Sequence, residues 1–305
     1  IRWRPSLVIL LATESLTSMM LYLISQLLGT FVLLIVEENN ERKHDCIFIQ
    51  LLAKIKGFLT KTIYKRAKIV IAESDASKEY LDVSMGIRKE KIRVIPHGTN
   101  IKYFNLQPKD PAFARSIGIS DENLEKITVL FVGELSEGKG AEYLVKSIFD
   151  ISDNNNIIFL IPSIGNVFNK HENELTRIKN IHIYPQLKIS DMPKLYSLAD
   201  ILVAPSKFYE TGSSDRSPNS LIEAMAFGKA VIGSNAGGIP TIIRNAGIVI
   251  PPNNSDAITE AILTLASDKN LIKELGKKAR DRAVKALNNK AYAYELINIF
   301  MEADI

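Results

Sequence analysis

The stretch that indicates the fold most clearly is Ser217-Pro-Asn-Ser220-Leu-Ile-Glu223-Ala-Met-Ala-Phe227-Gly-Lys-Ala230-Val-Ile-Gly233. A helical pattern covers residues 220–227, and a short apolar run typical of a buried strand follows at residues 230–233. The same alternation of apolar runs and helical patterns continues along most of the chain. Regular alternation of this kind predicts parallel sheets with helices on both faces.

Ten apolar runs are predicted as strands, four before a break in the pattern and six after it. They are residues 7–11, 31–36, 68–72, 92–95, 128–132, 157–161, 181–184, 201–204, 230–233 and 247–250. The break, at residues 105–121, contains Pro108, Pro111, Gly118 and charges of both signs. We therefore expect an α/β protein with two doubly wound units joined near residue 107. The tail, residues 258–303, is predicted to be helical throughout.

Composition limits the class of protein. At 305 residues the chain is longer than one ordinary domain, and its 46% hydrophobic and 24% charged residues are those of a soluble globular protein. The net charge of +4 fits anionic ligands or an acidic membrane surface, but it is too small for a nucleic-acid-binding protein. One cysteine, Cys46, excludes a disulfide framework and favours a cytoplasmic setting. The four histidines have no zinc-site spacing, so no metal site is predicted.

An uncharged run of 22 residues, 15–36, has two interpretations. It is long enough to cross a bilayer. The alternative, which we favour, is a buried helix over residues 16–28, a stop at Gly29 and a buried strand over residues 31–36, because β-branched residues cluster only after the glycine. Because the chain begins at Ile1 rather than Met, we also expect that an N-terminal portion precedes it.

Gly133-Glu-Leu-Ser-Glu-Gly138-Lys139-Gly140 connects a predicted strand to a predicted helix. In open parallel sheets, ligands bind beyond the carboxyl ends of the strands. The loop matches the phosphate-loop pattern G-x-x-x-x-G-K-[ST], except that Gly140 replaces the hydroxyl residue that would hold magnesium. Such a turn can bind phosphate through backbone amides, the helix dipole and Lys139. The alternative is a plain turn whose glycines only permit a positive φ.

Ser217 followed by Pro218 is a helix-start signal, with the serine as N-cap. Amides at such a start would bind an anion. Glu223 lies one turn further along, on the same face as Ser220, and either forms a capping box with it or contacts a ligand. Asp215, on the preceding loop, favours the second interpretation, because carboxylates beside a phosphate site suit the hydroxyls of a sugar nucleotide.

Three stretches together carry a resemblance to a known family: residues 215–240, Phe131-Val-Gly133 to Lys139-Gly140, and Val94-Ile-Pro-His-Gly98-Thr-Asn100. They resemble the retaining glycosyltransferases of family four (glycosyl transferases group 1), which have the GT-B fold. The resemblance covers nearly the whole chain. It implies two Rossmann-like domains facing a cleft: residues 1–107 on the acceptor side, residues 108–287 on the nucleotide-sugar side, and a C-terminal helix over residues 288–305 that returns to the first domain.

The resemblance also implies an activity, namely retaining transfer of a sugar from a nucleoside-diphosphate sugar to a hydroxyl of a glycan or lipid-linked acceptor (EC 2.4). It points to polysaccharide or glycolipid synthesis on the cytoplasmic side. No cofactor or metal is required, and catalysis would be mostly electrostatic. The alternative is a non-catalytic glycosyltransferase-like binding or scaffold protein. A nucleotide triphosphatase is disfavoured by Gly140.

Site residues are implied by matching the family's E-x7-E motif, whose second acid falls at Glu223 and would hold the ribose hydroxyls. Its first acid, which would contact the transferred sugar, falls by spacing at Asp215. The implied catalytic residues are Asp215, Glu223 and Lys139. The implied donor-binding residues are Gly133, Lys139, Ser217, Asn219, Ser220, Leu221, Glu223, Gln186, Leu187 and Glu210.

Several positions depart from the family pattern. Glu134 stands where the family usually has an arginine beside the diphosphate, and Arg216 is a candidate substitute. Glu210 follows an aromatic pair as the family's first acid does, so it competes with Asp215, which we prefer. In the first domain, Glu37-Glu38 replaces the usual histidine, and the family's first glycine-rich loop has no counterpart. We therefore expect an incomplete first domain.

A basic, partly apolar segment covers residues 51–68, with six lysine or arginine residues and no acid. The simpler interpretation, which we favour slightly, is a solvated helix face. The alternative is a surface helix that docks on anionic lipid, which would place the protein peripherally on the inner face of the membrane.

Overall fold

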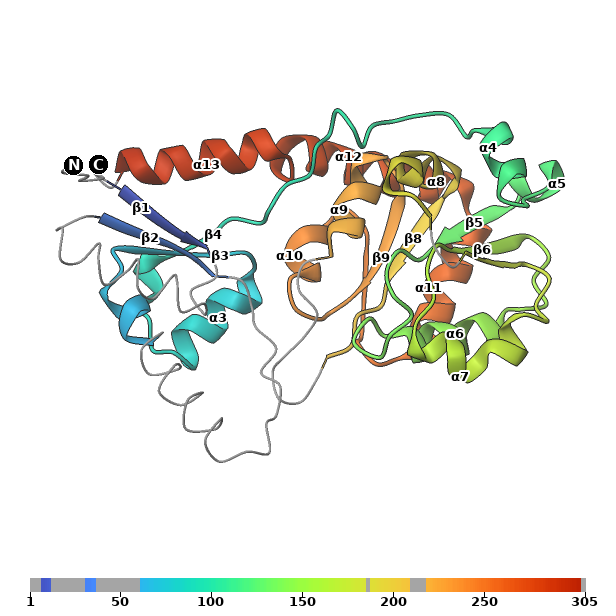
Figure 1. Cartoon of the computed structure of the whole chain (residues 1–305), viewed down its shortest axis with the longest axis horizontal. Helices are drawn as coiled ribbons and strands as arrows, with labels where there is room; N and C mark the ends of the chain where they lie inside the picture. Colours follow the sequence, from blue (N-terminus) through green and yellow to red (C-terminus); the bar gives the residue numbers. More distant parts are fainter. Residues whose placement is uncertain (1–6, 12–30, 37–60, 185–186, 209–217, 303–305) are drawn as a thin grey trace. The chain divides into compact units, whose positions relative to one another are not determined.

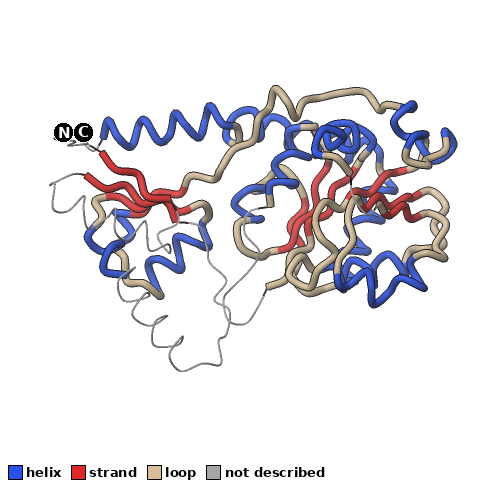
Figure 2. Tube along the Cα trace, viewed as in Figure 1, coloured by secondary structure: helices blue, strands red, loops and turns tan. Residues whose placement is uncertain are grey.

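In the computed structural model, residues 7–11, 31–36, 61–184, 187–208 and 218–302 are described (Figures 1 and 2). The chain divides into two compact units. The N-terminal unit comprises Ile1–His97 with Tyr292–Ile305, and the C-terminal unit comprises Gly98–Ala291. The division lies before the junction predicted near residue 107, and it assigns most of the last helix to the N-terminal unit.

The N-terminal unit contains a parallel sheet with the order β1-β2-β3-β4. Its strands are β1 (Leu7–Leu11), β2 (Phe31–Val36), β3 (Ile69–Ala72) and β4 (Ile92–Val94). Its described helical segments include residues 61–66, α3 (Asp75–Val83) and most of α13 (Asn289–Glu302). The side chain of Ser74 starts α3 by accepting a hydrogen bond from the amide of Ser77.

Strand β3 shows how this sheet is covered, because its alternate residues enter two different apolar clusters. Val70 and Ala72 pack with Leu81 of α3 on one side. Ile69 and Ile71 pack with Ile299 of α13, joined by Ile95, Tyr292 and Leu296. The C-terminal helix therefore completes the core of the N-terminal unit.

The C-terminal unit contains a six-stranded parallel sheet with the order β10-β9-β8-β5-β6-β7. Its strands are β5 (Ile127–Leu130), β6 (Ile157–Ile161), β7 (Ile181–Ile183), β8 (Ile201–Ala204), β9 (Ala230–Ser234) and β10 (Ile248–Ile250). Numbered within the unit, this is the order of a dinucleotide-binding Rossmann fold, and the strand order reverses between β5 and β8. Ligands of such sheets bind at the carboxyl ends of the strands beside this switch point.

Helices cover both faces of this sheet (Figure 1). One face packs against α8 (Met192–Leu198), α9 (Asn219–Ala226) and α10 (Ile239–Ile243), and the other packs against α6 (Ala141–Asp150), α7 (Asn166–Leu175) and α11 (Ser255–Ser267). The long α12 (Lys269–Ala286) contributes to both clusters. Two short helices, α4 (Pro111–Ser116) and α5 (Asp121–Leu124), precede β5.

The structure confirms each of the predicted strands to within two residues at either end. Strands β3, β5, β6, β8 and β9 are fully buried, which explains why continuous apolar runs identified them. Strands β4, β7 and β10 are partly exposed. The tail predicted to be helical consists of three helices, α11, α12 and α13. Asp268 caps α12 by accepting from the amides of Asn270 and Leu271, and Asn288 similarly accepts from the amide of Ala291 at the start of α13.

The uncharged run at residues 15–36 is only partly described. Its predicted helix, residues 16–28, lies outside the described residues, whereas its predicted strand is β2, which pairs with β1 and β3. Among the described helices, none is both long enough and apolar enough to cross a membrane.

Candidate functional site

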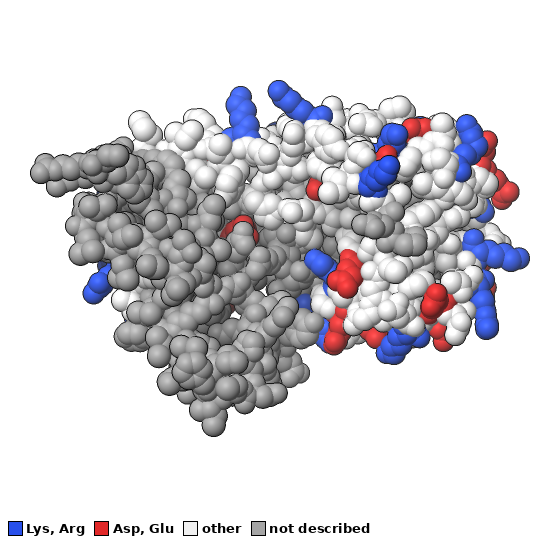
Figure 3. Space-filling model, in the orientation of Figure 1, with Lys and Arg blue, Asp and Glu red and all other residues white. Residues whose placement is uncertain are grey.

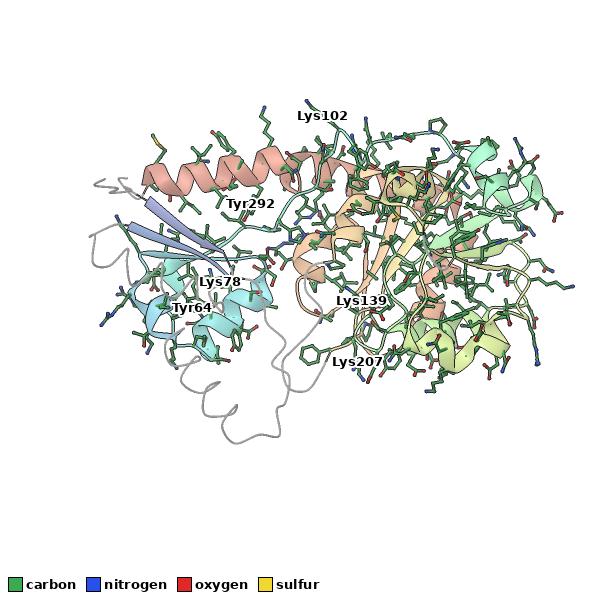
Figure 4. The ribbon with its side chains drawn as sticks, in the orientation of Figure 1. Tyr64, Lys78, Lys102, Lys139, Lys207 and Tyr292 are labelled. Carbon is green, nitrogen blue, oxygen red and sulfur yellow. The ribbon has the colours of Figure 1, made fainter. Side chains whose placement is uncertain are left out.

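Two loops meet where the strand order of the C-terminal unit reverses. One follows β5 and contains the glycine-rich sequence ending at Gly140, and the other follows β8 and begins at Pro205. The backbone N–H of Lys207 donates to the carbonyl of Gly138 at 3.0 Å, and the ammonium of Lys207 pairs with Glu137. Figure 4 shows Lys139 and Lys207 on the same side of this unit. The structure therefore brings the predicted phosphate loop to the edge where a Rossmann sheet binds its ligand.

Gly140 is required by close packing rather than by magnesium chemistry. It adopts a left-handed conformation with φ +70 and forms the N-cap of α6. A Cβ atom at this position would lie 1.8 Å from the carbonyl oxygen of Pro205, so no side chain fits. The hydroxyl residue of a magnesium-binding phosphate loop is thus excluded by the backbone of the neighbouring loop, which removes the geometric basis of the triphosphatase interpretation.

The turn also uses its own amides. The N–H groups of Lys139 and Ala141 donate to the carbonyl of Ser136 at 3.2 and 3.3 Å, and the N–H of Gly140 donates to Glu137 at 2.9 Å. The expectation that amides of this turn bind phosphate is therefore wrong for these three groups. What the loop can contribute to an anion is chiefly the charge of the Lys139 side chain.

Gly133 and Glu134 determine what surrounds that lysine. Gly133 has φ +150, and the Cγ and Cδ atoms of Lys139 lie 3.9 Å from where a Cβ at Gly133 would be, so the lysine stem lies over the glycine. The side chain of Glu134, which replaces the expected arginine, packs against Gly165: its Cγ is 2.8 Å from the Cβ position there. Gly165 is the N-cap of α7, where a carboxylate is favoured by the helix dipole.

Helix α9 begins one residue later than the sequence predicted. Its first helical residue is Asn219 and its N-cap is Pro218, which forms no side-chain cap, so the expected Ser217 N-cap with Pro218 as first helical residue is wrong. A proline can precede a helix because it needs no hydrogen-bond partner for a backbone N–H. Asn219 is exposed, Ser220 is half-buried and Leu221 is buried, and the amide of Leu221 donates to Pro218 at 3.0 Å.

Glu223 does not form the alternative capping box with Ser220. Because α9 starts at Asn219, Ser220 is the second helical residue rather than the N-cap. The Glu223 carboxylate instead accepts a 2.6 Å hydrogen bond from the hydroxyl of Tyr196, a buried residue of α8. Burial raises the pKa of Glu223 above its ordinary value, and the hydrogen bond from Tyr196 opposes this shift.

The remaining predicted residues divide into two groups. Glu210, Asp215, Ser217 and Gln186 lie outside the described residues, as does Arg216. The segment that carries the two competing acids follows Phe208, whose backbone N–H and C=O both bond to the side-chain amide of Asn253 at 3.2 and 2.9 Å. Leu187 is half-buried and packs against the apolar cluster of the α8–α10 face.

Lys207 and Tyr196 were missed by the sequence analysis. Tyr196 falls within a helical pattern at residues 192–198, and a tyrosine in a helix is usually assigned to the core, so no pattern indicated its contact with Glu223. Charge patterning gave no signal either: lysine, arginine and acidic side chains are interspersed over the face of the C-terminal unit seen in Figure 3.

Comparison with known proteins decides the family. The model of the family "Glycosyl transferases group 1" matches residues 113–282, which is more than half of the chain. The chain belongs to this family of glycosyl transferases. An uncharacterized glycosyltransferase of Methanocaldococcus jannaschii is 28% identical over 76% of this chain and 59% of its own length. The chain spans less than two thirds of the length of this relative.

Solved structures confirm the fold class. Sucrose-phosphate synthase from Thermosynechococcus elongatus superimposes with a TM-score of 0.74 at 22% identity, covering 99% of this chain and 74% of that one. Anabaena HepE in complex with UDP gives 0.76 at 17% identity, covering 96% and 78%. Both likenesses extend over the two sheet-containing units, so the predicted α/β fold with two Rossmann-like, parallel-sheet domains of GT-B type is confirmed.

Proposed function

We propose that this chain is a retaining glycosyltransferase that moves a sugar from a nucleoside-diphosphate sugar to a hydroxyl of a glycan or lipid-linked acceptor. One observation carries the proposal. In a domain of the glycosyltransferase family, the strand order reverses between β5 and β8. The loop after β5 supplies Lys139, and the first helix after β8 supplies the half-buried carboxylate of Glu223. A lysine can bind the negative charge of a diphosphate, and a carboxylate can accept hydrogen bonds from the hydroxyls of a ribose.

Each residue has a distinct role in this proposal. Lys139 and the first amides of α9 stabilise the diphosphate as its negative charge grows in the transition state. Glu223 accepts hydrogen bonds from the ribose hydroxyls, and Asp215, with Glu210 as the competitor, orients the transferred sugar. No covalent intermediate and no bound metal are invoked. Catalysis then rests on positioning and on charge stabilisation of the leaving group.

Related structures support the donor class. HepE was solved with UDP and with UDP-glucose. Lys139 lies in the loop after β5, and Glu223 lies on the helix that follows the loop after β8. Ligands of a Rossmann sheet bind beside these strands, which supports the proposed roles of the two residues. The acceptor side is proposed from the family resemblance alone.

A thermal-shift panel tests donor binding. UDP-, GDP- and ADP-glucose and GDP-mannose would be added separately, since a ligand at about 100 times its Kd stabilises the folded state by roughly 2.7 kcal/mol. We expect at least one to raise the Tm, and Glu223→Gln, which keeps an acceptor for Tyr196, to remove most of that shift. If none of the four raises the Tm, the proposed function is wrong. A donor shift that is unchanged in Glu223→Gln favours the non-catalytic alternative.

The choice of first acid has its own test. With a donor that the panel shows to bind, the rates of sugar transfer to water or to an acceptor would be compared between Asp215→Asn and Glu210→Gln. We expect Asp215→Asn to lose turnover with donor binding largely retained. A loss confined to Glu210→Gln reverses the assignment.

Peripheral membrane association is proposed for the basic segment. Of its described residues, Lys65, Arg66 and Lys68 are exposed. Each lysine or arginine near an anionic surface contributes about 1 kcal/mol of attraction. Flotation with vesicles of increasing anionic lipid content should increase the bound fraction, and binding that is indifferent to lipid charge would reject the proposal.

A further inference from the structure

Tyr196 is a fully buried tyrosine whose hydroxyl reaches the edge of the candidate site. Its side chain is 0% exposed, and its hydroxyl donates to Oε2 of Glu223 at 2.6 Å. Burial first, and then the Glu223 carboxylate, raise the pKa of Tyr196 well above its ordinary value. The phenol therefore stays protonated and acts as a permanent hydrogen-bond donor.

Aromatic packing fixes the direction of that donor. The ring of Tyr196 stacks on Phe227 with centroids 5.6 Å apart and an interplanar angle of 22°. Phe104 packs edge-on against both rings, at 5.9 Å from Tyr196 and 6.3 Å from Phe227. Such arrangements are the favourable geometries of aromatic pairs. A ring held from two sides has little freedom to turn its hydroxyl away from Glu223.

The same packing connects the two helices. Phe227 follows the last residue of α9 and lies four positions after Glu223, so both approach Tyr196 from one side of that helix. Tyr196 itself lies in α8, which leads into β8. The hydrogen bond and the ring stack together tie the carboxylate to the strand at the switch point.

The hydrogen bond from Tyr196 also gives the two carboxylate oxygens of Glu223 different roles. Oε2 is committed to the phenol, in a short bond typical of a hydroxyl donating to a charged acceptor. Oε1 is the oxygen left to meet a ligand, and Glu223 is only half-buried. A ribose offers hydroxyl donors that match such an acceptor.

We propose that Tyr196 is a positioning residue for donor binding: it holds Oε2 of Glu223 so that Oε1 is presented to the ribose hydroxyls of the nucleotide. This inference rests on the proposed function, in which Glu223 binds that ribose. Tyr196 touches no substrate in this arrangement and acts through Glu223.

The direct test is Tyr196→Phe, which removes one hydroxyl and keeps the aromatic cluster. Affinity for UDP-glucose, or for whichever member of the four-donor panel binds, would be measured by calorimetry. We expect about a tenfold increase in Kd. Ser197→Ala is the matched control, because it removes another buried hydroxyl of α8, one that donates to the carbonyl of Lys194 at 2.6 Å. Its Kd should stay at the wild-type value.

A double-mutant cycle separates positioning from simple destabilisation. If Tyr196 acts through Glu223, adding Tyr196→Phe to Glu223→Ala, which has no side-chain oxygen to position, causes far less than the tenfold loss it causes alone. An equal loss in both backgrounds overturns the inference. Tyr196→Phe with an unchanged Kd also overturns it, while a weakened Glu223→Gln would still support the proposed function. If Glu223→Gln itself binds normally, the proposed function fails first.

The pH profile gives a second readout that a structural role would not change. Because the Tyr196 hydrogen bond lowers the pKa of Glu223, its removal should move the acid limb of donor binding to higher pH. Should Tyr196→Phe fold poorly, Phe104→Leu loosens the ring and keeps the hydroxyl. It should weaken donor binding less than Tyr196→Phe and leave the acid limb in place; an acid limb shifted as far as in Tyr196→Phe would overturn the inference.

Discussion

Gly140 and Pro205 are in such close contact that a Cβ atom on the first would lie 1.8 Å from the carbonyl oxygen of the second. The two residues belong to the loops after β5 and β8, the strands between which the sheet order reverses. Their contact fixes how the loop that carries Lys139 lies on the chain leading towards α9. The absence of a side chain at position 140 is thus a condition for assembling the site.

Replacing Gly140 with alanine should destabilise the C-terminal unit strongly. Both the positive φ and the contact with Pro205 oppose a side chain, and we expect a loss of roughly 3 kcal/mol or more in the free energy of unfolding. Gly118→Ala is the control, because Gly118 has φ +81 but nothing within 4 Å of its Cβ position. It should cost only about 1 kcal/mol. Urea unfolding measures both, and equal losses would mean that the Pro205 contact is unimportant.

Gly140→Ser carries a further expectation, since it restores the sequence of a phosphate loop. The serine would meet the same carbonyl oxygen of Pro205 as alanine does. We therefore expect no magnesium-dependent ATP turnover from this variant, together with a stability loss like that of Gly140→Ala. ATP hydrolysis by Gly140→Ser above the wild-type level would contradict the steric argument.

Lys139→Met should weaken donor binding about 10- to 100-fold. The amides of Lys139, Gly140 and Ala141 are already bonded within the loop, so the ammonium is the main attraction that these residues can offer a diphosphate. Lys146→Met is the control on the following helix, where Lys146 is 64% exposed and 3.8 Å from Asp256. Calorimetry at two salt concentrations should show a smaller salt dependence for Lys139→Met than for wild type. Equal donor affinity in the two variants would remove Lys139 from the site.

The fold was predictable because most of its central strands are buried on both faces. Strands such as Ile157–Ile161 read as continuous apolar runs, and the break after Asn105 separated two groups of them. What could not be predicted was the start of α9, where Ser217 had the stronger capping signal and yet Pro218 occupies the N-cap. The choice depends on where the preceding loop lies, which local sequence does not record.

The sequence predicted residues for the candidate site but not the contacts that those residues make. Motif spacing pointed to Lys139, in the loop after β5, and to Glu223, in the first helix after β8. Position 140 must be glycine because it packs against the carbonyl of Pro205, which lies 65 positions away along the chain (205 − 140). The hydrogen-bond partner of Glu223 is Tyr196, which belongs to another helix. Contacts between elements of this kind depend on packing, and a single sequence does not reveal them.

Glu223→Gln should change the pH dependence of stability. Because burial raises the pKa of Glu223 above its ordinary value of 4.5, the folded chain binds this proton more tightly than the unfolded chain. Its contribution to stability is therefore fully present below pH 4.5 and is lost as the pH rises through the raised value. The glutamine cannot ionise and escapes that loss. Urea unfolding without ligand should show the variant gaining on wild type between pH 4 and pH 7.5; a constant difference across this range would contradict the shift.

Ile299→Ala tests whether α13 belongs to the core of the N-terminal unit. Ile299 is 5% exposed and packs with Ile69, Ile71 and Ile95, so its truncation should cost roughly 2–3 kcal/mol of unfolding free energy. Ile297, on the same helix, is 53% exposed, and Ile297→Ala should change stability by less than about 0.5 kcal/mol. Helix propensity favours alanine equally at both sites, so the difference between the variants isolates burial. Equal effects would mean that the helix does not pack on this sheet in solution, and a large loss confined to Ile299→Ala would establish that the chain's last helix stabilises its first sheet.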